Sequence, residues 1–123
     1  MILIGYSLGA DVLPFMADRL PTDLQNRVRK IVLLGPDKKA DFEFHFLEWL
    51  GHSDGKSARP VLLEVEKLRR RRILCLHGAE EKNSLCPDIS RHLAKTILIP
   101  GGHHFGGKYE AIARIILKEN ITK

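Results

Sequence analysis

A five-residue segment near the start of the chain, Gly5-Tyr6-Ser7-Leu8-Gly9, constrains the fold more than any other feature. An apolar run at 1–4 precedes it, and apolar residues at helical spacing follow it as far as Leu20. The first run predicts a buried strand and the second an amphipathic helix, which Pro14 should kink or interrupt. A serine between two glycines at such a strand-to-helix turn is typical of sharp, strained backbone that exposes the hydroxyl. The glycines on either side would let the strand and the helix approach each other.

The rest of the chain alternates between the two-residue period of strands and the longer period of helices. Further strands are predicted at 28–34, 42–46, 73–76 and 96–99, most of them apolar on both faces as in central parallel strands. Further helices are predicted at 60–68, 87–94 and 109–117. This order predicts a single α/β domain over residues 1–123, with a mainly parallel sheet flanked by helices.

Composition and charge narrow the function classes. The chain is 44% hydrophobic and 28% charged, which is typical of a globular protein. No apolar run reaches the roughly 18–20 residues that cross a membrane, and no signal peptide is recognisable, so the chain as given is expected to stay in the cytoplasm. Much of the net charge of +5 lies in Arg69–Arg72, which we interpret as a solvated connection. No nucleic-acid partner is expected, because no aromatic residues interleave with this run.

The strand-to-helix motif makes Ser7 the candidate nucleophile and the backbone N–H of Leu8 a candidate oxyanion-hole donor. A serine hydroxyl needs a base, and in folds with this turn the acid and then the histidine follow along the chain. The loop after the strand at 73–76 carries Glu81, the predicted acid, and Glu80 as the alternative. Asp88, on the helix predicted next, is a weaker third choice.

The loop after the last predicted strand, Gly101-Gly102-His103-His104-Phe105, should supply the histidine. The spacing Gly-x-x-His selects His104 as the base and leaves His103 as the alternative or as a pocket residue. A metal site is not expected, because neighbouring histidines point apart and no third ligand stands at a suitable spacing.

Four other residues carry open alternatives. Asp11 either stabilises the start of its helix or faces the pocket, where Tyr6 is also a candidate. Cys75 and Cys86 are either two buried thiols or a disulfide closing a short loop.

Four blocks of this sequence resemble the bacterial VirJ/AcvB virulence-protein domain, an α/β-hydrolase branch. They are Gly5–Phe15, Ile73–Glu81, Ser84–Pro87 and Pro100–Phe105. The resemblance implies a periplasmic, virulence-associated serine hydrolase without a cofactor, acting on an ester such as aminoacylated phosphatidylglycerol, notably the lysyl form. It implies that Ser7 attacks the carbonyl, His104 acts as base and Glu81 orients it.

The family resemblance carries further expectations. A lysyl substrate would suit Asp11, a lipid substrate implies contact with a membrane surface, and a periplasmic location favours the Cys75–Cys86 disulfide. Such domains have strands before the motif, and one of these segments supplies a second oxyanion donor, so we expect a domain truncated at its N-terminus. The strand at 1–4 would then be an exposed apolar edge that promotes self-association. A non-catalytic binding or assembly module, or an inactive fragment, remains the alternative.

Overall fold

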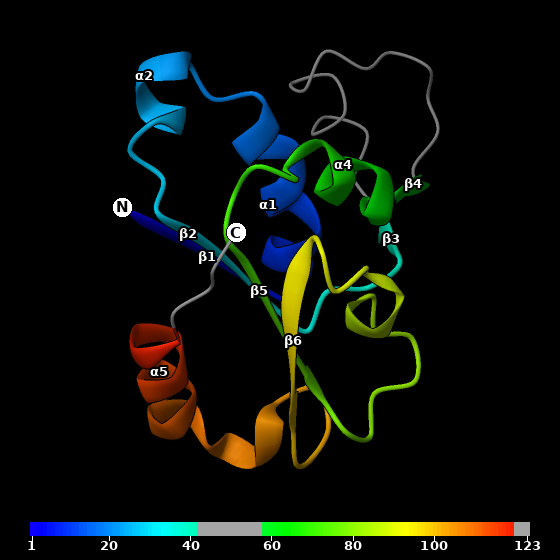
Figure 1. Cartoon of the computed structure of the whole chain (residues 1–123). Helices are drawn as coiled ribbons and strands as arrows, with labels where there is room; N and C mark the ends of the chain where they lie inside the picture. Colours follow the sequence, from blue (N-terminus) through cyan, green and yellow to red (C-terminus); the bar gives the residue numbers. More distant parts are fainter. Residues whose placement is uncertain (42–57, 120–123) are drawn as a thin grey trace.

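A four-stranded parallel sheet in the order β1-β2-β5-β6 forms the centre of the molecule (Figure 1). The computed structural model describes residues 1–41 and 58–119. The sheet consists of β1 (Ile2–Tyr6), β2 (Lys30–Leu34), β5 (Ile73–Gly78) and β6 (Ala94–Ile99). The helices are α1 (Leu8–Asp18), α2 (Thr22–Gln25), α4 (Val61–Lys67) and α5 (Tyr109–Lys118), with 3-10 turns η1 (Cys86–Asp88) and η2 (Phe105–Gly107). The short strands β3 (Lys39–Asp41) and β4 (Ala58–Pro60) form a separate antiparallel pair.

The predicted α/β class with a parallel sheet is confirmed, and two local predictions differ from the structure. Helix α1 is continuous across Pro14. The helix predicted at 87–94 is reduced to the single turn η1, because the backbone becomes extended at Ile89, whose ψ is 129°. The strand predicted at 42–46 lies outside the described residues.

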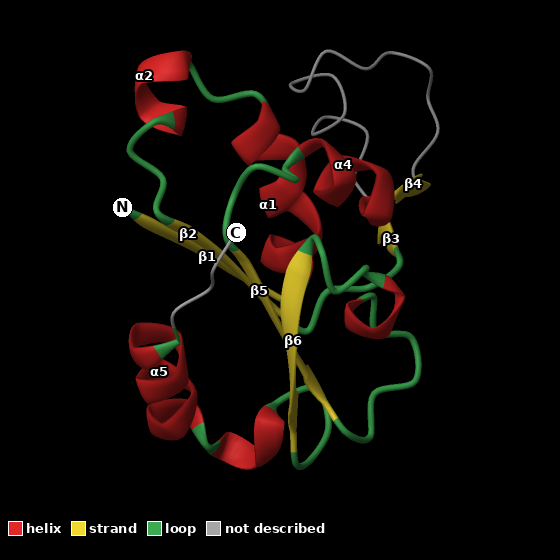
Figure 2. Cartoon of the chain, viewed as in Figure 1, coloured by secondary structure: helices red, strands yellow, loops and turns green. Residues whose placement is uncertain are grey.

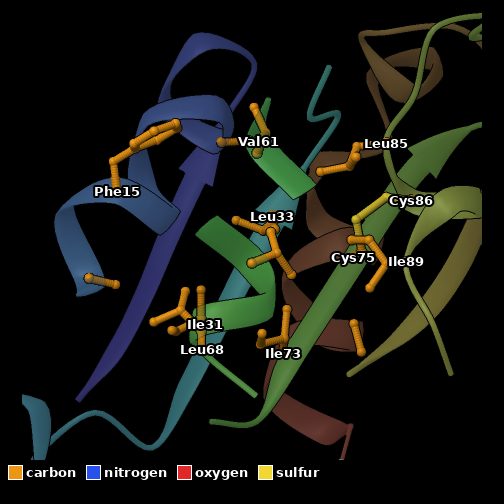
Figure 3. Packing of buried hydrophobic residues seen from close by; sticks show 14 residues of the cluster. Phe15, Ile31, Leu33, Val61, Leu68, Ile73, Cys75, Leu85, Cys86 and Ile89 are labelled. Atoms are coloured by element: carbon orange, nitrogen blue, oxygen red, sulfur yellow. A yellow bond between two sulfur atoms is a disulfide. The ribbon is translucent and has the colours of Figure 1, made fainter. Parts of the chain in front are cut away.

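Successive residues of the central strands belong to two separate hydrophobic cores. Ile31 and Leu33 of β2 pack with residues of α1 and α4, whereas Val32 between them packs with residues of α5. The same alternation occurs in β5. Figure 2 shows α1 and α4 on one side of the sheet and α5 on the other. Figure 3 shows the first core, where Phe15 and Val61 approach the sheet. Two-sided burial therefore holds the strand ends in fixed positions.

Strand β1 lies at one edge of the sheet and pairs only with β2 among the described strands. Its apolar side chains stay partly in contact with solvent: Ile2 is 38% exposed and Ile4 54%. An apolar edge of this kind can pair with a strand of another chain. Self-association through this edge stays a prediction. In the described part of the chain, no helix has the length and apolarity required to span a membrane.

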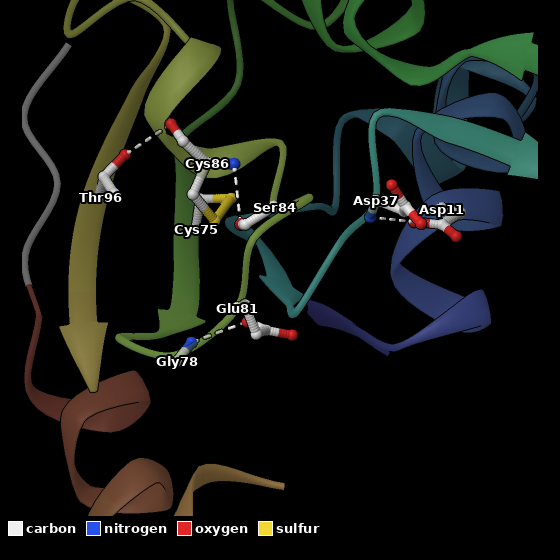
Figure 4. The surroundings of a disulfide bond; sticks show 8 residues. All are labelled: Asp11, Asp37, Cys75, Gly78, Glu81, Ser84, Cys86 and Thr96. Atoms are coloured by element: carbon white, nitrogen blue, oxygen red, sulfur yellow. Dashed lines mark hydrogen bonds between the residues drawn. A yellow bond between two sulfur atoms is a disulfide. The ribbon is translucent and has the colours of Figure 1, made fainter. Parts of the chain in front are cut away.

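A disulfide joins β5 to the segment before β6. Cys75 is bonded to Cys86, and their Cα atoms lie 5.6 Å apart (Figure 4). Of the two alternatives left open for these cysteines, the structure therefore contains the disulfide. The bridge closes a loop of sequence separation 11, which corresponds to about 3 kcal/mol of stabilisation in the chain-entropy model.

Candidate active site

The turn that carries Ser7 has the strained geometry expected from the motif. The backbone of Ser7 has φ 57° and ψ −120°, which a residue with a side chain rarely adopts. Its N–H donates to the carbonyl of Leu34 at 2.9 Å, which fixes the turn to the neighbouring strand. A Cβ on Gly5 would lie 2.4 Å from the carbonyl oxygen of Gly9, so the absence of a side chain lets α1 pack on β1. At Gly9, by contrast, a Cβ would meet no described atom within 4 Å. Of the two glycines expected to let the strand and the helix approach each other, only Gly5 is required for this by its surroundings.

Ser7, His103 and Glu81 form a continuous hydrogen-bonded series. Nε2 of His103 lies 2.8 Å from Oγ of Ser7, and Nδ1 of the same ring contacts Oε1 of Glu81. The other carboxylate oxygen of Glu81 accepts from the backbone N–H of Gly78 at 2.7 Å (Figure 4). A carboxylate on Nδ1 favours the tautomer with a proton there, which leaves the lone pair of Nε2 facing the serine hydroxyl.

Topology accounts for this convergence. Ser7 follows β1, Glu81 follows β5 and His103 follows β6, and all three strands are parallel. Their carboxyl ends therefore meet on one side of the molecule, which we call the carboxyl end of the sheet. The Glu81 side chain is only 11% exposed, whereas that of His103 is 41% exposed. The carboxylate is thus enclosed and the imidazole stays accessible from solvent.

His103, which the sequence left as the alternative, occupies the position that was predicted for His104. His103, not His104, lies between Ser7 and Glu81, while Nδ1 of His104 lies 2.9 Å from the hydroxyl of Tyr6. The backbone of this loop explains the difference. Gly101 has φ 104° and Phe105 has φ 55°, so the loop forms a tight turn in which the spacing Gly-x-x-His does not decide which ring faces Ser7.

Tyr6 holds the histidine turn in place, a role that sequence reasoning did not identify. Its ring stacks on His103 with centroids 5.4 Å apart and an interplanar angle of 24°. Its hydroxyl donates to the backbone carbonyl of His103 at 3.1 Å and also contacts His104. Desolvation raises the pKa of Tyr6 further above neutral pH, where the phenol is already protonated and able to donate. The only sequence signal was its place beside the serine.

Gly35 approaches the histidine and the glutamate from the end of β2. Its φ is 64°, and a Cβ there would lie 2.9 Å from Cε1 of His103 and 3.2 Å from Oε1 of Glu81. A side chain at this position would therefore press directly on the contact between the two residues. The sequence by itself did not indicate this role for Gly35.

A cavity of about 160 Å³ adjoins His103, with Asp37 and Lys82 in its wall. Asp11 does not line it, although one alternative placed it in the pocket. Asp11 is buried, and Oδ1 accepts from the N–H of Asp37 at 2.7 Å (Figure 4). Burial raises the pKa of Asp11 to about 6 despite this hydrogen bond. Asp11 therefore supports the turn beside the cavity, while Asp37 is exposed.

The remaining predicted residues have simple placements. Leu8 is the first residue of α1, so its N–H has no carbonyl partner within the helix and remains a candidate oxyanion donor. Glu80 is exposed, and its backbone N–H donates to Gly101 at 3.0 Å. Within 1–41 and 58–119, no three His, Cys, Asp or Glu residues lie close enough together to hold a metal ion.

Comparisons with known proteins agree with the architecture. The chain is similar in structure to the thioesterase domain from the curacin biosynthetic pathway, with a TM-score of 0.60 and 14% sequence identity. The match covers 96% of this chain and 66% of that domain, so it establishes an α/β-hydrolase fold and nothing about substrate. No curated protein sequence matches significantly. The family model described as bacterial virulence protein (VirJ) matches residues 1–123. This chain therefore belongs to the VirJ family of bacterial virulence proteins.

Proposed function

We propose that this chain is a serine hydrolase that cleaves a carboxylic ester or thioester. The observation that carries the proposal is the series Ser7–His103–Glu81 on a strained strand-to-helix turn, with 2.8 Å between Nε2 and Oγ. That distance is within the range in which a base can take a hydroxyl proton. Membership of the family and the α/β-hydrolase fold support the same class of reaction.

The first half of the proposed reaction acylates Ser7. Its Oγ attacks the carbonyl carbon while Nε2 of His103 takes the hydroxyl proton. Negative charge develops on the carbonyl oxygen, where the N–H of Leu8 at the start of α1 would stabilise it. When the intermediate collapses, the bond to the leaving alcohol or thiol breaks and the leaving group takes the proton from His103. Glu81 keeps the ring oriented and stabilises its protonated form.

The second half of the reaction restores the serine. A water molecule gives a proton to His103 and attacks the acyl carbon. The bond between the acyl carbon and Oγ breaks, Ser7 regains the proton from His103, and the acid is released. The 41% exposure of the His103 side chain leaves room for the alcohol or thiol to depart and for water to enter.

A cationic aminoacyl group, as in a lysyl ester of phosphatidylglycerol, is the substrate that we propose in more detail. Support comes from Asp37, an exposed carboxylate in the wall of the cavity beside His103. Asp11 would act indirectly by holding the N–H of Asp37. The disulfide between Cys75 and Cys86 supports an oxidising compartment such as the periplasm, and a lipid ester would be reached at a membrane surface.

Labelling with a fluorophosphonate probe tests the nucleophile and separates the two histidines. We expect the unmodified chain to be labelled, the Ser7→Ala and His103→Ala variants to be unlabelled, and His104→Ala to keep at least a tenth of the labelling rate. The matched histidine pair is informative because only one ring contacts Ser7. Circular dichroism of each variant checks folding.

Two results would overturn the proposal. Labelling that persists in a folded Ser7→Ala chain would exclude Ser7 as nucleophile. A folded, unlabelled chain that also fails to hydrolyse p-nitrophenyl acetate would favour the alternative of a non-catalytic binding module. The substrate proposal has a separate test, because Asp37→Asn should raise KM for a lysyl ester and leave KM for an acetyl ester unchanged.

A further inference from the structure

Two basic segments that lie far apart in the sequence meet at the beginning of the central strands. Arg27 and Arg29 precede β2, and the run Arg69–Arg72 precedes β5. Parallel pairing aligns Ile31 with Ile73, and the N–H of Ile31 donates to the carbonyl of Arg72 at 2.8 Å. Figure 1 shows both connections at the end of the sheet opposite the loops that follow β5 and β6. We call this side the amino end of the sheet.

A hollow of about 320 Å³ opens between these segments, and we call it the arginine hollow. Its wall consists of Val28, Arg29, Arg70, Arg71 and Arg72. Three of the four arginines are exposed, and Arg71 donates to the side-chain oxygen of Gln25 at 3.5 Å. No carboxylate belongs to the described wall, so the charged side chains of the wall itself are all positive.

This arrangement has an electrostatic cost that an anion would remove. Guanidinium groups keep their charge at every accessible pH, so the four cannot relieve their mutual repulsion by losing protons. The backbone pairing of β2 with β5 prevents the two segments from separating. A planar guanidinium donates in a fork that matches the oxygens of a phosphate group, and several such forks around one hollow favour a ligand with more than one negative charge.

We propose that the arginine hollow binds a phosphate-bearing ligand, at a site distinct from the one that contains Ser7. Substrate chemistry does not account for it, because Ser7, Glu81 and His103 all lie at the carboxyl end of the sheet. The proposal is independent of the hydrolase activity. Soluble compounds and phospholipid headgroups both carry such a phosphate, and the experiment separates these two sources.

Isothermal titration of the full chain with inorganic pyrophosphate at low ionic strength is the primary test. We expect saturable binding that weakens at least tenfold in the double variant Arg70→Gln and Arg72→Gln. The matched control, Lys108→Gln with Arg114→Gln, removes the same charge from exposed positions at the start and in the middle of α5 and should change Kd less than twofold. Arg29→Gln provides an independent variant from the other segment and should weaken binding at least threefold.

Vesicles identify the source of the phosphate. Binding to phosphatidylglycerol vesicles that pyrophosphate displaces, with none to phosphatidylcholine vesicles alone, would support a lipid headgroup. Pyrophosphate binding without vesicle binding would support a soluble ligand. The proposal is overturned if pyrophosphate does not bind, or if the variants of the hollow and of α5 weaken binding equally. Tighter, arginine-dependent binding of a DNA oligonucleotide that pyrophosphate cannot displace would also overturn it, in favour of a nucleic-acid site.

Discussion

Ionisable side chains gather at both ends of the parallel sheet, but at the carboxyl end they contact one another and at the amino end they are exposed to solvent. At the carboxyl end, Glu81 and His103 are joined to each other and to Ser7, and the Glu81 side chain is 11% exposed. At the amino end, Arg29, Arg70 and Arg72 are exposed around a hollow in which no described wall residue is a carboxylate. Parallel pairing produces both clusters, because it places all strand beginnings on one side and all strand ends on the other.

The two clusters differ in how far their side chains are exposed to solvent. Enclosed groups interact strongly and depend on individual atoms, so an isosteric change at the carboxyl end should have a large effect. Exposed arginines interact weakly with their surroundings, and single substitutions at the amino end should leave stability and turnover nearly unchanged.

The largest effect is expected from Glu81→Gln, which replaces the carboxylate on Nδ1 of His103 by an amide of similar shape. The amide can present its NH2 group to Nδ1 and so favour the wrong tautomer, which should lower kcat by about a thousandfold. Glu80→Gln is the matched control, because Glu80 is exposed and should change kcat less than twofold. Steady-state hydrolysis of p-nitrophenyl acetate measures both. An equal loss in the two variants would mean that enclosure does not distinguish these neighbours.

A smaller effect, on stability, is expected at the two glycines of the motif. Gly5→Ala would place a methyl group 2.4 Å from the carbonyl oxygen of Gly9 and should lower the free energy of unfolding by about 3 kcal/mol. Gly9→Ala meets open space within α1 and should raise that free energy by up to about 1 kcal/mol. Urea unfolding followed by circular dichroism compares the two. A Gly9→Ala protein as unstable as Gly5→Ala would show that another segment packs against Gly9.

The smallest effect is expected from Asp11→Asn and depends on pH. Because burial raises the folded-state pKa of Asp11 from 3.8 to about 6, the folded state binds more protons than the unfolded state between these values. Stability should therefore fall as the pH rises from about 4 to 6, by about 1 kcal/mol after allowance for solvent screening. Asn can still accept from the N–H of Asp37, so this variant should lack that decline. Thermal unfolding at pH 4, 5, 6 and 7 measures it, and parallel curves for the two proteins would exclude Asp11 as its source.

Several features of the fold could be predicted from short-range patterns. The apolar runs at 28–34 and 73–76 predicted β2 and β5, because strands buried on both faces leave a continuous apolar signal. The helix predicted at 87–94 differs from the structure, because the pattern of polar and apolar residues does not show that the chain becomes extended at Ile89. The sequence could not decide whether Asp11 faces the pocket or stabilises its helix, because its hydrogen-bond partner Asp37 is 26 residues away.

By itself, the sequence determined the parallel α/β class, the turn at Ser7 and the loop that carries Glu81, because each depends on the periodicity or chemistry of neighbouring residues. Only the tertiary structure decided that His103 rather than His104 faces Ser7, that Tyr6 stacks on this ring, and that Arg29 meets the arginine run. These choices depend on backbone angles in a tight turn and on strand pairing across more than 40 residues. A short stretch of sequence cannot determine these angles or this pairing, because both are set by the packing of the whole sheet.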